Sequence, residues 1–200
     1  MRVGDCRKDS FAVKCAFFCI GLFFACAASF GADLPTSCAQ ALRRALSARA
    51  AWTMERRLAG AECTLVSTGE VVCASGEGIV WRVLHPFPSS VTMTATSMIF
   101  ADEDGVRSKP LADLPHYGEI RARTDAFARG DTAAFDGLFS VEAHSGSNGW
   151  RLVFTPEVRA MRRLFSSIEV TGGAELSESI LKTGDGCITR ISFKELPRAR

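Results

Sequence analysis

The stretch Gly78-Ile79-Val80-Trp81-Arg82-Val83-Leu84-His85-Pro86 sets large apolar residues around a charged one, and it decides the fold class. If Arg82 points to solvent, Ile79, Trp81 and Val83 point to the opposite face, with a bulge or twist near Ile79. Such one-sided alternation is typical of an antiparallel strand with one buried and one solvated face.

Similar short apolar or alternating segments recur along most of the chain. They predict strands at Trp52–Leu58, Cys63–Val66, Glu70–Ala74, Ile79–Leu84, Val91–Thr94, Ser97–Phe100, Leu138–Ala143, Trp150–Thr155, Leu164–Val170, Leu176–Lys182 and Cys187–Phe193. Turn residues separate these segments, among them Ser67–Gly69, Asp102–Gly105, Ser145–Gly149 and Gly184–Gly186. Short strands with regular turn signals predict two antiparallel meanders.

Two segments break the strand pattern. Ser37 and Gln40 have the spacing of a capping box, and the amphipathic pattern after them predicts a helix over Ala39–Ala51. The segment Lys109–Leu138 mixes apolar and charged residues and predicts one or two helices between the meanders. The order helix, meander, helices, meander predicts a β-rich fold whose helices can cover one open end of a curved sheet.

The first residues have the pattern of an export signal. Four basic residues precede or flank the apolar run Cys15–Ala28, and small residues follow it, which predicts a secretory signal peptide over 1–31 and one domain over 32–200. An uncleaved membrane anchor is the alternative, although the run is short of the roughly 20 residues of a membrane span. The leader holds four of the 24 basic and two of the 22 acidic residues, so the rest is balanced in formal charge. Net charge therefore gives no argument for nucleic-acid binding.

Four cysteines follow the predicted leader: Cys38, Cys63, Cys73 and Cys187. An even number in an exported chain indicates disulfide bonds. A hairpin turn centred on Thr68 would place Cys63 opposite Cys73, which leaves Cys38 to pair with Cys187. Four free thiols are the alternative, and a thiolate metal site is disfavoured because no Cys-x-x-Cys pair is present.

The sequence has no recognisable catalytic or cofactor motif. No two of its three histidines, His85, His116 and His144, have metal-ligand spacing. It also lacks a Gly-x-Ser-x-Gly elbow and a phosphate-binding glycine loop. We therefore expect a protein that is not an enzyme and that uses no cofactor and no metal.

The inward-facing residues are large, flat or flexible. A solid core is the simplest role for them. The alternative is a cavity for acyl chains, because side chains do not always fill a strongly curved sheet. Burial contributes roughly 0.8 kcal/mol per methylene, so such a ligand needs no charged contact. The candidate cavity residues are Trp52, Met54, Leu58, Ile79, Trp81, Val83, Val91, Met93, Phe127, Phe135, Trp150, Leu152 and Phe154.

Several motifs resemble the periplasmic lipoprotein-carrier family, LolA and its relatives. Trp52–Glu55 stands where the family commonly has Phe-Thr-Gln, and Gly78–Pro86 resembles the family's apolar strand with an inner Trp and a closing Pro. Trp150–Glu157 is similar to the family's Leu-Thr-Pro-Lys strand end. The resemblance spans nearly the whole chain after the leader. It implies a mainly β (α+β) fold, an incomplete antiparallel β-barrel or half-barrel with helices covering a hydrophobic cavity.

The resemblance also implies a function. The protein would be a monomeric periplasmic carrier that binds the acyl chains of lipoproteins, or of a related lipid, and shuttles them from the inner to the outer membrane. Its partners would be an inner-membrane release complex or exporter and an outer-membrane acceptor. A membrane-tethered module that senses or accepts lipoproteins on the same half-barrel is the alternative, and a secreted enzyme with an unrecognised site is a third hypothesis.

Overall fold

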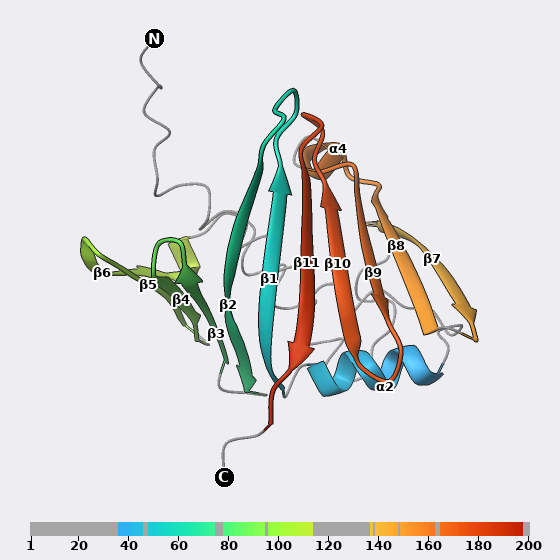
Figure 1. Cartoon of the computed structure of the whole chain (residues 1–200), viewed down its shortest axis with the longest axis horizontal. Helices are drawn as coiled ribbons and strands as arrows, with labels where there is room; N and C mark the ends of the chain where they lie inside the picture. The colour runs from blue at the N-terminus through green and yellow to red at the C-terminus, as the bar shows by residue number, and fades with distance from the viewer. Residues whose placement is uncertain are drawn as a thin grey trace.

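The computed structural model describes residues 36–45, 48–74, 78–94, 96–113, 137, 139–147, 149–162 and 165–197, and every structural statement refers to them. Eleven strands form one antiparallel sheet in the order β6-β5-β4-β3-β2-β1-β11-β10-β9-β8-β7 (Figure 1). The strands are β1 (Arg49–Arg57), β2 (Thr64–Ala74), β3 (Gly78–His85), β4 (Ser89–Met93), β5 (Ser97–Asp102), β6 (Gly105–Pro110), β7 (Phe139–Gly146), β8 (Gly149–Pro156), β9 (Ser167–Gly172), β10 (Leu176–Lys182) and β11 (Ile188–Glu195). The helices are α2 (Thr36–Ala45), α4 (Arg159–Arg162) and the short 3-10 helix η1 (Leu111–Asp113).

The sheet consists of two meanders that meet in its middle. β1 to β6 form the first meander and β7 to β11 the second, and β1 lies antiparallel to β11 with Ala50 opposite Glu195. In Figure 1 the strands β3 to β6 turn steeply away from β1, so the sheet is strongly curved. The sheet is open, with β6 and β7 at its edges. This arrangement confirms the predicted mainly β half-barrel.

Alternation along the strands separates an apolar from a polar face. On β8, Trp150, Leu152 and Phe154 are buried, whereas Arg151 and Thr155 are exposed. A side chain points to the opposite face at each step along a strand, so all the buried residues of β8 share one face. α2 packs on this face through Cys38 and Ala41. We call it the inner face.

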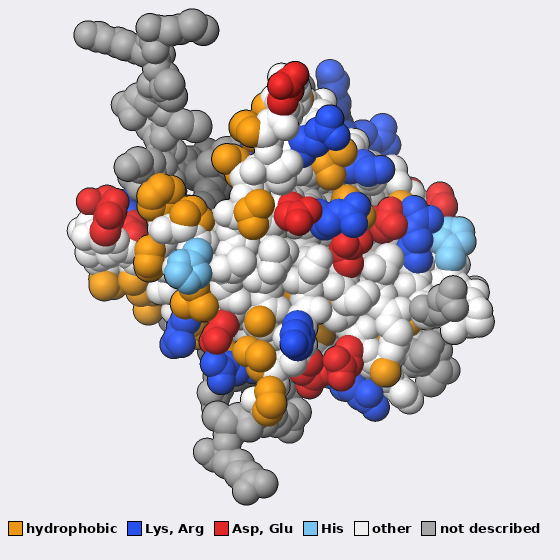
Figure 2. Space-filling view, viewed as in Figure 1, with side chains coloured by type: hydrophobic (Ala, Val, Ile, Leu, Met, Phe, Trp, Pro, Cys, Tyr) orange, Lys and Arg blue, Asp and Glu red, His pale blue; other side chains and the backbone are white. Residues whose placement is uncertain are grey.

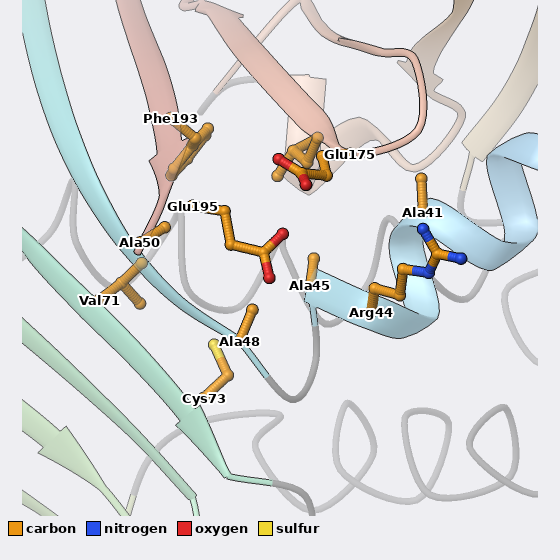
Figure 3. A pocket seen from close by; sticks show the side chains of 11 residues that line it. Ala41, Arg44, Ala45, Ala48, Ala50, Val71, Cys73, Glu175, Phe193 and Glu195 are labelled. Atoms are coloured by element: carbon orange, nitrogen blue, oxygen red, sulfur yellow. The ribbon is translucent and has the colours of Figure 1, made fainter. Parts of the chain in front are cut away.

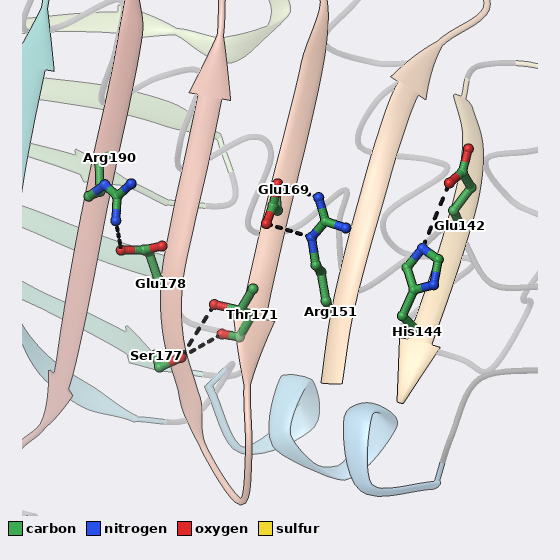
Figure 4. Close-up of polar contacts among 8 residues, drawn as sticks. All are labelled: Glu142, His144, Arg151, Glu169, Thr171, Ser177, Glu178 and Arg190. Atoms are coloured by element: carbon green, nitrogen blue, oxygen red, sulfur yellow. Dashed lines mark hydrogen bonds and ion pairs between the residues drawn. The ribbon is translucent and has the colours of Figure 1, made fainter. Parts of the chain in front are cut away.

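The other face of the sheet, the outer face, carries ion pairs over β8 to β11 and exposed apolar side chains such as Val66 and Val106 toward β6. Figure 2 shows basic and acidic side chains interspersed over it. Arg151 on β8 donates two hydrogen bonds to Glu169 on β9, at 2.6 and 2.8 Å, and these bonds lower the pKa of the Glu169 carboxyl (Figure 4). Arg190 on β11 donates to Glu178 on β10 at 2.9 Å. Opposite charges on neighbouring strands keep this face solvated and leave the inner face for apolar packing.

The predicted turn at Ser67–Gly69 is wrong. β2 runs unbroken through this segment, and the turn lies earlier, between Arg57 and Thr64. Gly69 stands opposite Trp52 of β1, and a Cβ atom at Gly69 would lie 2.5 Å from Cζ2 of Trp52 and 1.9 Å from the carbonyl oxygen of Arg82. The glycine is required by the close approach of an indole ring and of the next strand.

Three further expectations need correction. The predicted helix over Ala39–Ala51 ends early, because β1 already begins at Arg49 and pairs with strands on both sides. β6 was not predicted, since Gly105–Pro110 is exposed along its whole length and has no apolar face. The bulge on β3 lies at Leu84, which is left unpaired where the β2–β3 register shifts between Thr68 and Gly69, and not near Ile79.

Two predicted segments lie outside the described residues. They are the leader over 1–31 and most of the helical segment, 114–136. Within the described ranges, no helix has both the length and the apolar character that a membrane span requires.

Candidate functional site

Most of the predicted cavity residues meet on the inner face, in two apolar clusters. The tryptophan-pair cluster contains Trp52, Ile79, Trp81 and Val91, with Met54, Val83 and Met93 partly buried against it. The phenylalanine cluster contains Trp150, Leu152 and Phe154, together with Phe139 and Phe165. Phe193 of β11 packs against both clusters, so the apolar surface is continuous across the middle of the sheet.

Three of the predicted residues are not part of these clusters. Leu58 is half-buried just beyond the end of β1 and belongs to neither. Phe127 and Phe135 lie outside the described residues. The clusters also contain residues that the prediction missed, namely Cys38, Ala41, Val71, Cys73, Met98, Leu111, Phe139, Phe165, Ile168, Val170, Leu176, Leu181 and Ile191. Alternation in β9 was the signal that could have identified Ile168 and Val170.

Each meander places a tryptophan over a glycine of the neighbouring strand. Trp52 of β1 lies over Gly69 of β2, and Trp150 of β8 lies over Gly172 of β9. A Cβ atom at either glycine would come within 2.5 Å of Cζ2 of the opposing indole. Trp52 also stacks on Trp81, with ring centroids 4.6 Å apart and ring planes 20° from parallel. The missing side chains let both indoles lie close to the backbone.

The two indole N–H groups differ in their hydrogen bonding. Nε1 of Trp150 donates to the carbonyl oxygen of Gly173 at 2.8 Å. Nε1 of Trp52 is buried and has no hydrogen-bond partner in the described chain. Leaving a buried donor without a partner costs about 1–3 kcal/mol. The tryptophan-pair cluster therefore holds one unsatisfied polar group among apolar side chains.

A shallow pocket opens where the two clusters meet. It lies between α2 and the ends of β2 and β11 (Figure 3). Small side chains, those of Ala41, Ala45, Ala48 and Ala50, leave this space, and the larger Val71, Cys73, Leu176 and Phe193 complete the apolar wall. Arg44, Glu175 and Glu195 supply the polar part of the lining.

The predicted disulfide bonds are absent. Cys38, Cys63, Cys73 and Cys187 are all free. Cys63 directly precedes β2 and Cys73 lies near its end, so the length of the strand separates them, roughly 30 Å at about 3.3 Å per residue. The pairing failed because the turn that would have brought them together does not exist. Burial raises the pKa of the Cys38 thiol to about 12 and that of Cys73 to about 11.

Alkylation should distinguish these thiols. In the native protein we expect iodoacetamide to modify exposed Cys63 rapidly at neutral pH, while Cys38 and Cys73 stay unmodified. Because their pKa values are raised, the reactive thiolates form in the folded protein only as the pH approaches 11 to 12. In the unfolded chain the same two thiols lose their protons at lower pH, near their ordinary pKa of 9.0, than they do in the folded protein. The free energy of unfolding therefore falls as the pH rises above 9. Mass spectrometry of unreduced, denatured protein should find all four alkylated, and a protected Cys63–Cys73 pair would contradict the structure.

No family model matches the sequence, and no curated protein matches it. Among solved structures, a LolA superfamily protein of Nitrosomonas europaea is 9% identical, with 77% of this chain and 87% of that chain covered and a TM-score of 0.36. A domain of Vibrio parahaemolyticus described as an outer membrane lipoprotein-sorting protein is 11% identical, with 79% and 91% covered and a TM-score of 0.34.

A third structure is the Pseudomonas aeruginosa MucA/MucB complex, to which the chain is 12% identical with a TM-score of 0.43. The match covers 78% of this chain but only 55% of the chain in that complex. One of the three structures is described as a member of the superfamily that the strand motifs resemble. All three TM-scores lie below 0.5, so the function of this chain has to come from its own residues.

Proposed function

We propose that this protein is a periplasmic carrier that binds the acyl chains of lipoproteins, or of a related lipid, on its inner face. One observation carries the proposal: an open, curved sheet gathers its buried apolar side chains on one face, in two clusters joined across the middle of the sheet by Phe193. A hydrocarbon chain laid along such a surface gains roughly 0.8 kcal/mol for each methylene removed from water. Neither a charged contact nor a chemical step is needed.

The packing of the inner face supports a surface that can rearrange. Met54, Val83 and Met93 are only partly buried at the margin of the tryptophan-pair cluster. Methionine is unbranched and adapts its shape to irregular neighbours, so two of these three residues can move aside for a ligand. The pocket beneath α2 gives an acyl chain a starting point, since it opens to solvent between the two clusters.

The site of action and the partners belong to the same proposal. The predicted signal peptide over 1–31 would direct the chain to the periplasm. There it would receive its cargo from an inner-membrane release complex or exporter and deliver it to an outer-membrane acceptor. The paired charges over β8 to β11 on the outer face suit a carrier that crosses an aqueous compartment.

A matched pair of variants tests the use of the inner face. Val83 and Val80 are both half-buried on β3 and point to opposite faces. We expect Val83→Glu to abolish binding of a fluorescent fatty-acid probe, because it places a charge on the apolar surface. Val80→Glu should bind the probe like the natural protein. Equal binding by two folded variants would place the ligand elsewhere.

Cargo identity can be read from the protein itself. Native mass spectrometry of protein isolated from the periplasm without detergent, followed by solvent extraction, should reveal an acylated peptide or a lipid. If the protein carries nothing and also fails to bind the fluorescent probe, the inner face is a packed core and the carrier proposal fails.

A further inference from the structure

We infer that Trp52 recognises the carbonyl oxygen of the bound acyl group, with its indole Nε1–H as the hydrogen-bond donor. The inference rests on the proposed function and adds the chemistry by which the inner face distinguishes an ester or amide of a fatty acid from a plain hydrocarbon. The site is the part of the tryptophan-pair cluster around Trp52, Met54 and Val83.

The first observation is the unsatisfied donor. Trp52 is only 2% exposed, and its Nε1 has no hydrogen-bond partner among the described residues. Buried polar groups in folded proteins are nearly always paired, so an orphan calls for a physical explanation. An acceptor supplied by a ligand is such an explanation, because the side chains of the tryptophan-pair cluster are apolar and offer no acceptor.

The second observation is the contrast with Trp150. Both tryptophans lie over a glycine of the next strand in the same way, yet Nε1 of Trp150 donates to the carbonyl oxygen of Gly173 at 2.8 Å. The packing of an indole over glycine is therefore compatible with a satisfied N–H group. The orphan at Trp52 is particular to the first meander.

The third observation is the surroundings of the Trp52 ring. Met54 is the next inward-facing residue along β1, and Val83 stands opposite Gly69, over which the ring extends. Both are partly buried and lie at the margin of the cluster. Movement of the flexible Met54 side chain would bring a ligand beside the ring on the side away from Trp81, whose stacking holds the ring in place.

The donor matches one ligand group. An indole N–H group donates and cannot accept, so it pairs with an oxygen acceptor and contributes nothing to a methylene chain. Lipids of the proposed cargo class carry a carbonyl oxygen where each acyl chain is attached. Trp52 would thus fix the position of the chain's attachment point, while the apolar surface holds the rest of the chain.

Two neutral probes of similar length test the inference: methyl laurate, which has a carbonyl, and tetradecane, which has none. Their affinities for the full chain are measured by displacement of a fluorescent fatty-acid probe. In Trp52→Phe, which keeps a ring but loses the N–H group, we expect methyl laurate to bind roughly three- to tenfold more weakly, the worth of one hydrogen bond. Tetradecane should bind that variant and the natural protein alike. Val80→Glu is the control, because Val80 points to the outer face, and it should leave the preference for methyl laurate unchanged.

A second measurement does not depend on the variant folding. In ¹⁵N-labelled natural protein, the Trp52 indole N–H resonance should move downfield with methyl laurate and stay in place with tetradecane. Suppose that the natural protein binds both probes, that methyl laurate does not shift the Trp52 resonance, and that Trp52→Phe has the same preference for methyl laurate as the natural protein. The inference is then overturned, and the carrier proposal stands. If natural protein binds neither probe, the carrier proposal fails, and the inference fails with it.

Discussion

Replacing Gly69 by alanine should lower the free energy of unfolding by about 3 kcal/mol, the upper end of the usual range for overpacking. The added methyl group would lie 1.9 Å from the carbonyl oxygen of Arg82 and 2.5 Å from Cζ2 of Trp52. The oxygen belongs to the backbone of a paired strand and cannot rotate away. The indole is held by its stack on Trp81. Urea denaturation followed by tryptophan fluorescence measures the loss.

Gly146→Ala is the matched control for that experiment. Gly146 also lies in a strand, but a Cβ atom there meets no other atom within 4 Å. Its stability should therefore change little. Equal losses in the two variants would mean that the general cost of altering a strand glycine, and not the approach of Trp52, explains the result.

Phe154→Ala should cost about 3–5 kcal/mol, the usual penalty for truncating a buried phenylalanine. Phe154 is 1% exposed at the centre of the phenylalanine cluster and meets Phe139 edge to face, with ring centroids 6.2 Å apart. Its removal leaves a cavity that the two surrounding strands cannot close. Leu65→Ala, at a position 51% exposed, should change the stability by less than about 0.5 kcal/mol. A small loss in Phe154→Ala would show that this part of the inner face is loosely packed.

Strand alternation made the inner face largely predictable. Arg82 and Arg151 had to face water, which places Trp81 and Trp150 on the opposite face, and the structure confirms both positions. The two meanders followed from two runs of short strands with turn signals between them, whereas the half-barrel was what the family resemblance implied. These predictions succeeded because one-sided burial is a local property that a strand carries in its own sequence.

The errors come from properties that depend on distant residues. Gly69 looks like a turn residue until Trp52 is placed opposite it, and the false turn led directly to the false Cys63–Cys73 bridge. Arg49 has no strand signal of its own and joins β1 because it pairs with Val72 of β2, while its carbonyl oxygen accepts a hydrogen bond from the N–H group of Leu196 at 2.8 Å. The unsatisfied N–H group of Trp52 is invisible in the sequence, since Trp150 has the same local setting and a partner.

The position of β1 beside β11 has a consequence for how the chain folds. Every other ladder of the sheet joins strands that are neighbours in sequence, so each meander can assemble from hairpins with short connections. Only the β1–β11 ladder requires the two ends of the described chain to come together. The conformational entropy lost in closing this long loop increases only with the logarithm of the number of residues in it. Changes in β1 or β11 that weaken this ladder should therefore slow folding, whereas changes in the edge hairpins β5–β6 and β7–β8 should mainly speed unfolding.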